Sequence, residues 1–178
     1  MRTVLFAAAL FAAALNQVRA DDDEAEKKAI AKIRESGALV LEIAQNDNRL
    51  DVSYITAQGK ITNEQLAPLK DLKRLAHLNL RGLEIGDDAL PHIAGQKTLV
   101  KLHLEKTKVT DKGLENLKGL ENLEYLNLYG TEIGDPGLEH LASLKKLKSL
   151  YLWQTKVTDE GVKKLQAALP ELKIVRGT

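Results

Sequence analysis

Four stretches of the chain align with one another without a gap, and they decide the fold: LAHLNLRGLEIGDDALPHI from Leu75, LVKLHLEKTKVTDKGLENL from Leu99, LEYLNLYGTEIGDPGLEHL from Leu123 and LKSLYLWQTKVTDEGVKKL from Leu147. The pattern therefore returns every 24 residues. A fixed period of this length is typical of a solenoid, in which each coil buries its apolar face only against its neighbours. Such a scaffold usually presents a surface for binding and seldom an active site.

Two columns of leucine define the predicted core. Within each unit, L-x-x-L-x-L ends in an alternation of leucine with other residues, which is the period of a β-strand with one buried face. We therefore predict that two columns point inward: Leu78, Leu102, Leu126 and Leu150, and Leu80, Leu104, Leu128 and Leu152. Counting back 24 residues from Leu78 and Leu80 places Tyr54 and Thr56 on the inward side of a degenerate first coil.

Polar columns follow the strands. Asp87, Asp111, Asp135 and Asp159 recur at the same interval, with Asn63 in the first coil, and each precedes a short helical pattern. Because Asp and Asn accept hydrogen bonds from the free amides of a helix's first turn, these five residues are predicted to cap the helices. A second column, Thr107, Thr131 and Thr155, is predicted to bond to backbone in the turn. Each coil offers one carboxylate in the Asp column and calcium needs about six to eight oxygens, so no metal is expected there.

The unit T-x-V/I-T-D-x-G-L, with the strand and turn before it, resembles the leucine-rich repeat family over about residues 51–177, in the 24-residue form of exported bacterial members. The resemblance implies an α/β solenoid: a right-handed curved coil with a parallel sheet on the concave face and short helices on the convex face. It also implies a binding role. The chain departs from the family in having Thr where Asn usually follows the strand, and in lacking the Cys-rich caps of some extracellular members.

The sequence divides into three parts. Residues 1–20 are predicted to be a signal peptide, because Arg2 precedes an apolar run over 4–15 that is shorter than the ~20 residues of a membrane helix, and Val18-Arg19-Ala20 resembles a cleavage site. An uncleaved anchor is the alternative. Residues 21–50 are expected to form an acidic tail and a helix and strand cap. Residues 51–178 form the repeat domain: the degenerate coil, four regular coils and a closing strand.

Composition and charge limit the partners. The whole chain has 26 basic and 25 acidic residues, interspersed along its length, which gives no support for a nucleic acid or an anionic membrane as partner. It has no cysteine, so no disulfide contributes to its stability. After cleavage following Ala20 we expect a secreted or periplasmic monomer without membrane insertion.

The candidate recognition surface consists of outward strand positions. Four of the five aromatic residues beyond residue 20 take such positions on two adjacent predicted strands, at Tyr125, Tyr129, Tyr151 and Trp153. Tyr and Trp are enriched at binding hot spots, although aromatic residues also favour strands for packing alone. The face is predicted to continue through His77, Asn79, Arg81, His103, Glu105 and Asn127. A protein is the expected partner, and a glycan that stacks on the rings is the alternative.

No catalytic machinery emerges from the sequence. His77 and His103 fall on neighbouring strands, but no third ligand or paired nucleophile converges on them, as a metal site or base catalysis would require. No catalytic residue, cofactor or enzymatic activity is therefore expected. The leading hypothesis is a non-enzymatic binding module. The alternatives are a structural repeat protein of the cell envelope and a host-directed effector that resembles eukaryotic leucine-rich substrate receptors.

Overall fold

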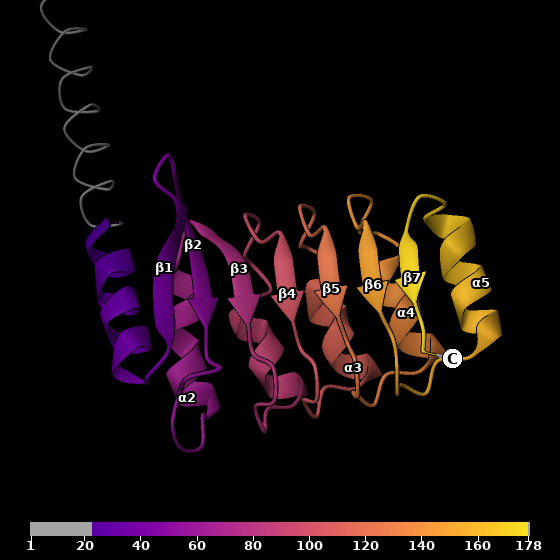
Figure 1. Cartoon of the computed structure of the whole chain (residues 1–178), viewed down its shortest axis with the longest axis horizontal. Coiled ribbons are helices and arrows are strands. Elements are labelled where there is room, and N and C mark those ends of the chain that lie inside the picture. The colour runs from indigo at the N-terminus through magenta and orange to yellow at the C-terminus, as the bar shows by residue number, and fades with distance from the viewer. Residues whose placement is uncertain (1–22, 178) are drawn as a thin grey trace, which may run out of the picture.

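The computed structural model describes residues 23–177 and confirms the predicted α/β solenoid (Figure 1). The predicted signal peptide lies outside the described residues. Seven strands follow one another in a single sheet in chain order. They are β1 (Leu39–Ala44), β2 (Asp47–Ser53), β3 (Leu75–Asn79), β4 (Lys101–His103), β5 (Tyr125–Asn127), β6 (Ser149–Tyr151) and β7 (Lys173–Val175).

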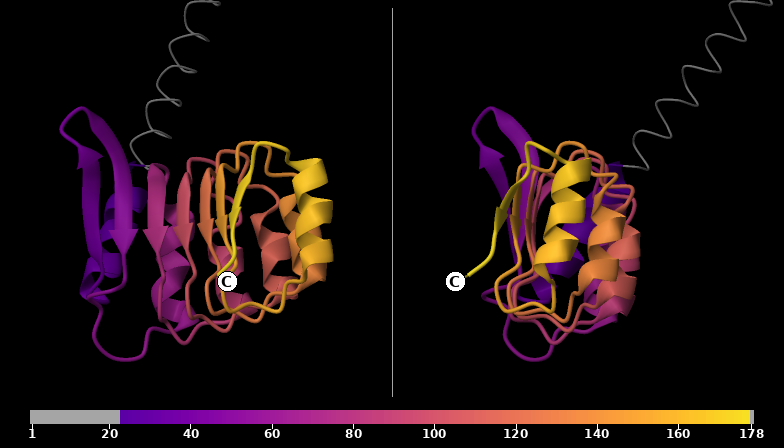
Figure 2. Two further views of the ribbon diagram at one scale, coloured as in Figure 1. Left: turned by 45° about the vertical axis from the view of Figure 1, so that its right-hand side comes forward. Right: turned by 90° about the vertical axis from the view of Figure 1, so that its right-hand side faces the viewer.

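The register of the sheet repeats the period of the sequence. All pairs from β2 to β7 are parallel, and Leu78, Leu102, Leu126 and Leu150 align in successive strands. Each of these leucines is fully buried, and the second leucine column is equally enclosed. The strands β1 and β2 instead form an antiparallel hairpin, whose turn reaches beyond the ends of the other strands (Figure 2).

Short helices cover the opposite side of the sheet (Figure 2). The α-helices are α2 (Asn63–Leu66), α3 (Asp111–Leu114), α4 (Asp135–Leu141) and α5 (Asp159–Ala168), and 3-10 helices span Ala67–Asp71, Asp87–His92 and Glu115–Leu117. Within the described part of the chain, no helix is long and apolar enough to cross a membrane.

An N-terminal helix packs against the first coil, and its described part spans 23–35. Ala29 and Ile33 are buried in the core. The carboxylate of Glu26, 6% exposed, accepts hydrogen bonds from the backbone N–H groups of Lys73 and Arg74 at 2.8 and 3.2 Å. The Nε of Arg74 donates to the same carboxylate at 3.0 Å. This buried acid joins the helix to the chain just before β3.

The first coil is longer than the repeat predicts. The parallel register aligns Val52 with Leu78, a separation of 26 residues, so the 24-residue count is wrong by two. Tyr54 is inward as predicted but takes the place of Leu80, and Thr56, predicted inward, is exposed. The N–H of Tyr54 bonds to the next strand as that of Leu80 does, and Tyr54 is 1% exposed. The two additional residues lie between Tyr54 and Asn63, where the chain makes a wider turn before α2.

The polar columns stabilise the coils in two ways. As predicted, the Thr hydroxyls donate to the carbonyl oxygens of Leu104, Leu128 and Leu152 at 2.8, 2.6 and 2.7 Å. The Asp column does not cap its own helices. The N-cap positions belong to the residues just before it, including Thr110, Gly134 and Thr158.

The Asp carboxylates bind the next coil instead. Oδ1 of Asp87, Asp111 and Asp135 accepts from the N–H of Thr110, Gly134 and Thr158 at 2.7, 2.7 and 2.8 Å. The prediction of helix caps was wrong because stacking brings the unsatisfied N–H of the following coil's N-cap within reach, while each Asp already lies in the first helical turn. Asn63 and Asp159, at the ends of the column, contact Asp88 and Arg176.

Candidate functional site

The surface that carries the candidate residues is the outward side of the sheet, called here the sheet face. Every large hydrophobic side chain that is exposed in residues 23–177 lies on it: Leu39, Leu41, Ile55 and Trp153, at 47, 60, 57 and 52% exposure. The placement of the β1 leucines follows from pairing, since Leu41 lies opposite Asp51, whose side chain bonds to His77 on the same face. The helical side shows no such residue among those described.

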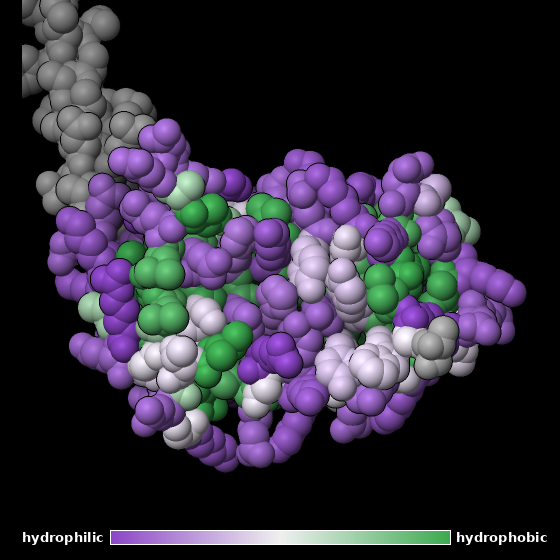
Figure 3. All heavy atoms as spheres, viewed as in Figure 1, coloured by the Kyte–Doolittle hydropathy of each residue, from purple (hydrophilic) through white to green (hydrophobic). Residues whose placement is uncertain are grey.

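The sheet face has three zones (Figure 3). From β1 to β6, hydrophobic atoms gather over β1 and β2, hydrophilic atoms over β3 and β4, and residues of intermediate hydropathy over β5 and β6, while hydrophobic atoms reappear near β7. We call these the apolar zone (Leu39, Leu41, Ile55), the polar zone (His77, Asn79, Arg81, Lys101, His103) and the aromatic zone (Tyr125, Tyr129, Tyr151, Trp153).

The aromatic zone is a pair of ring contacts. The centroids of Tyr129 and Trp153 are 5.2 Å apart with their planes at 22°, so these rings stack. Tyr125 and Tyr151 are tilted at 5.2 Å, and the ring of His103 lies 4.9 Å from Tyr125 on its other side. Burial raises the pKa of the Tyr125 hydroxyl, which accepts a hydrogen bond from Asn127 Nδ2 at 3.2 Å. The structure thus brings together the four predicted aromatic residues.

Neighbouring backbone fixes the indole of Trp153. A Cβ added at Gly177 would collide with Cδ1 and Nε1 of the indole, so the chain after β7 lies directly against it. Tyr129 and Trp153 each precede a turn residue in the left-handed region, Gly130 at φ 68° and Gln154 at φ 56°. Lys106 has the same place in its coil at φ 55°, and its Nζ lies 5.6 Å from the centre of the Tyr129 ring. The stacked pair is therefore held in position before any ligand arrives.

Each histidine of the polar zone is held by a carboxylate. Nδ1 of His77 lies 3.1 Å from Asp51 Oδ2, and Nδ1 of His103 lies 2.8 Å from Glu105 Oε1. A carboxylate oxygen therefore orients each ring through its Nδ1 atom. Glu105, predicted as an exposed ligand-binding residue, is 5% exposed, and that prediction was wrong: its outward strand position is covered by its neighbours. Its Oε2 is buried without a hydrogen-bond donor.

The side-chain oxygens of the two asparagines on the sheet face accept hydrogen bonds from the turns that follow them. Oδ1 of Asn79 accepts from the N–H of Arg81, and Oδ1 of Asn127 accepts from the N–H of Tyr129, both at 3.1 Å. Such short-range bonds are typical of Asn before a turn. These residues position the side chains that follow them, which leaves Arg81 exposed beyond the strand.

The sequence reasoning missed three parts of this surface. Leu39 and Leu41 were predicted to lie in a strand, but the side of the sheet that they occupy was not predicted. Val40 between them is inward, so the alternation of a strand could have placed both leucines on the outward side. Asp51 was missed because the longer first coil shifts the outward positions by two. Lys106 was missed because its approach to Tyr129 depends on the left-handed turn, which a lysine does not signal.

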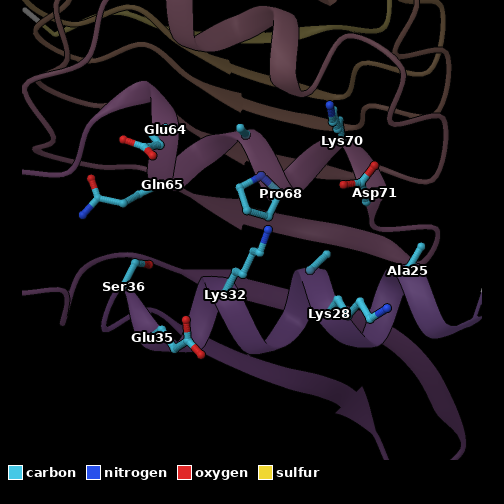
Figure 4. A pocket seen from close by; sticks show the side chains of 12 residues that line it. Ala25, Lys28, Lys32, Glu35, Ser36, Glu64, Gln65, Pro68, Lys70 and Asp71 are labelled. Atoms are coloured by element: carbon cyan, nitrogen blue, oxygen red, sulfur yellow. The ribbon is translucent and has the colours of Figure 1, made fainter.

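A groove of about 780 Å³ lies away from the sheet face, between the N-terminal helix and the segment of α2 and the following 3-10 helix. Figure 4 shows charged side chains of both signs along its walls, among them Lys28, Lys32, Glu35, Glu64 and Asp71. The groove is lined by no histidine, and the hydroxyl of its one serine, Ser36, donates to the backbone carbonyl of Ile33 at 2.6 Å. Over residues 23–177, no three His, Cys, Asp or Glu side chains converge as a metal site would need.

Comparisons with known proteins agree with this architecture. Residues 95–118 and 119–142 match the model of a leucine-rich repeat family. Among solved structures, the chain is similar to an internalin from Listeria monocytogenes at 24% identity and a TM-score of 0.55, over 64% of this chain and 31% of that one. Internalin C2 of the same bacterium has 28% identity and a TM-score of 0.48, over 62% and 54% of the two chains.

Actin-binding site 2 of leiomodin-1 is also similar, at 20% identity and a TM-score of 0.50, over 62% of this chain and 73% of that one. No curated protein sequence matches the chain. The chain thus spans about a third and about half of the two internalin chains that it resembles. The fold is thus that of a leucine-rich repeat solenoid, and residues 95–118 and 119–142 match two consecutive repeats of the leucine-rich repeat family.

Proposed function

We propose that the chain is a non-enzymatic binding module that holds a protein partner on its sheet face and acts as a secreted or periplasmic protein. The observation that carries the proposal is the distribution of exposed apolar surface. Within the described residues, all four exposed large hydrophobic side chains are on one face. Leu39, Leu41 and Ile55 lie together in the apolar zone, and an exposed apolar patch of this kind marks a site of interaction.

Two further observations support a protein as the partner. The aromatic zone offers rigid rings with polar tips, which is the composition of binding hot spots. One structure of similar fold is an actin-binding site, so this fold is compatible with binding a protein. Export rests on the sequence of residues 1–20 alone.

A pull-down from extracellular and periplasmic fractions tests the proposal, with the full chain, the variant Tyr129→Ala/Trp153→Ala and a matched helical-side variant, Lys112→Ala/Lys163→Ala, as bait. Because both substitution pairs are on the surface, all three proteins should fold equally, which circular dichroism checks. We expect the aromatic variant to lose the captured protein and the lysine variant to keep it. The reverse result would favour a structural role through the helical side. Capture that free oligosaccharide competes away would favour a glycan.

A further inference from the structure

The sheet face carries exposed positive charges that no carboxylate of the face pairs with. The two carboxylates of the strand columns are each hydrogen bonded by a histidine, and Glu105 is also buried. Four basic side chains on or beside the face are exposed, and none of them is within 4 Å of a carboxylate in the described structure: Arg81, Lys101, Lys106 and Lys173. By contrast, Lys148 and Lys156, on the loops around the sheet, pair with Glu124 and Glu132 of the coil before.

Three of the unpaired cations, Arg81, Lys101 and Lys106, lie between two apolar surfaces, and Lys173 lies beyond them on β7. Arg81 follows β3 and Lys101 is in β4, whereas Leu39 and Leu41 belong to β1, and Trp153 follows β6. Neighbouring strands are about 4.8 Å apart, so β1, which holds Leu39 and Leu41, is roughly 24 Å from β6, which Trp153 follows. A segment of about 7 extended residues or about 16 helical residues spans this distance.

We propose that the sheet face binds an acidic protein segment with large apolar residues at both ends. The inference rests on the proposed function and specifies its partner. Carboxylates at the centre of the segment face Arg81, Lys101 and Lys106, and the apolar ends contact the apolar zone and the Tyr129–Trp153 stack. Unpaired cations steer an acidic partner toward the face and repel a basic one.

A basic segment finds little to bind on this surface. The carboxylate oxygen that lacks a donor is Glu105 Oε2, and it is enclosed by protein rather than open to a ligand. The other acid of the strand columns, Asp51, already bonds to His77. The available charge on the surface is therefore positive.

Selection from a random library of 16-residue peptides displayed on phage tests the proposal. The full chain is the target, and peptides that also bind Tyr129→Ala/Trp153→Ala are removed so that sheet-face binders remain. We expect enrichment of Asp and Glu at the centre and of large apolar residues at both ends. Synthetic peptides without tryptophan can then be titrated by the fluorescence of Trp153, because it is the single tryptophan of the chain.

The contribution of positive charge to binding can be tested with substitutions that other coils already carry at the equivalent positions. Lys101→Ser introduces the residue that β6 has at the aligned position, Ser149, and Lys106→Gly introduces the residue of the equivalent turn, Gly130. The double variant should weaken the selected peptides roughly three- to tenfold at low salt, since two exposed pairs are lost. The control Lys112→Ser/Lys163→Ser removes the same charge from the helical side and should leave affinity unchanged. Added salt should weaken binding to the native face.

The outcomes separate the two proposals. Enrichment of basic or uncharged centres, or affinity of the Lys101→Ser/Lys106→Gly variant within about 1.5-fold of the native protein, overturns the acidic segment. If those peptides still need Tyr129 and Trp153, the sheet face remains the binding surface. If the selection yields no peptide that distinguishes the native face from the aromatic variant, the acidic segment is overturned, and the pull-down alone then decides the proposed function.

Discussion

A glycine column shows how tightly the coils are coupled, and Gly137 gives the sharpest test of it. Gly137 is buried in α4 beneath the Asp111 carboxylate of the coil before. A Cβ at this position would collide with Asp111 Oδ1 and would lie 3.0 Å from Ile133 Cγ2 and 3.2 Å from Asp111 Cα. Gly113 and Gly161 lie in the same way beneath Asp87 and Asp135.

The expected effect of Gly137→Ala is a balance of opposing terms. In an exposed helix the change stabilises by about 1 kcal/mol. Here overpacking costs about 1–3 kcal/mol. If Asp111 moves away, the hydrogen bond from the Gly134 N–H at 2.7 Å is lost, which costs about 1–3 kcal/mol more. We expect a net loss of about 2 kcal/mol, or roughly 4–8 °C in Tm for a chain of this size.

Thermal and urea unfolding followed by circular dichroism measures the loss, and a double-mutant cycle assigns its cause. In an Asp111→Ala background the collision with Oδ1 is absent and only the close contacts with Ile133 Cγ2 and the Cα of residue 111 remain, so Gly137→Ala should become neutral or stabilising by up to about 1 kcal/mol. Gly95→Ala is the matched control, because a Cβ there meets nothing within 4 Å, and it should be neutral or slightly stabilising. If Gly137→Ala is as stable as the native protein, or is equally harmful without Asp111, the steric account is refuted.

Three further predictions concern groups that join elements or titrate. Glu26→Ala should cost about 2–3 kcal/mol, because the acid accepts three hydrogen bonds, and hydrogen exchange should accelerate first in the helix over 23–35. Burial raises the pKa of Tyr54 to about 12, so its contribution to stability is complete below the unfolded pKa near 10 and is lost as pH rises toward 12. Tyr54→Phe should flatten that alkaline loss in urea unfolding. The hydrogen bonds from Thr158 lower the pKa of Asp135, so its contribution is present above the unfolded pKa and disappears as pH falls through the folded one. Asp135→Asn should therefore reduce the acid dependence of Tm, and an unchanged acid limb would contradict this role.

The core could be predicted from the repeat, whereas the contacts between neighbouring coils could not. Leu126 could be placed inward from alternation alone, and the threonine hydroxyls could be assigned to their turns, because both depend on residues close in sequence. The role of Asp111 depends on the coil that follows it, so a rule for isolated helices assigned it to the wrong amides. The same limit applies to the site. Aromatic residues could be located by column, whereas the burial of Glu105 and the approach of Lys106 to Tyr129 depend on how neighbouring coils fill the space.

The separation of columns also explains why binding and stability can be tested independently on this chain. The core is formed by leucines, and the coils are joined by Asp carboxylates and backbone, none of which uses the third outward strand position. That position holds Arg81, Glu105, Tyr129 and Trp153 in successive coils, so the fold itself requires no particular side chain there. The stacked Tyr129–Trp153 pair is therefore not needed to build the solenoid. Substituting the Tyr129–Trp153 pair should reduce partner binding far more than it reduces the free energy of unfolding. This is the behaviour expected of side chains that bind a partner and do not hold the fold together.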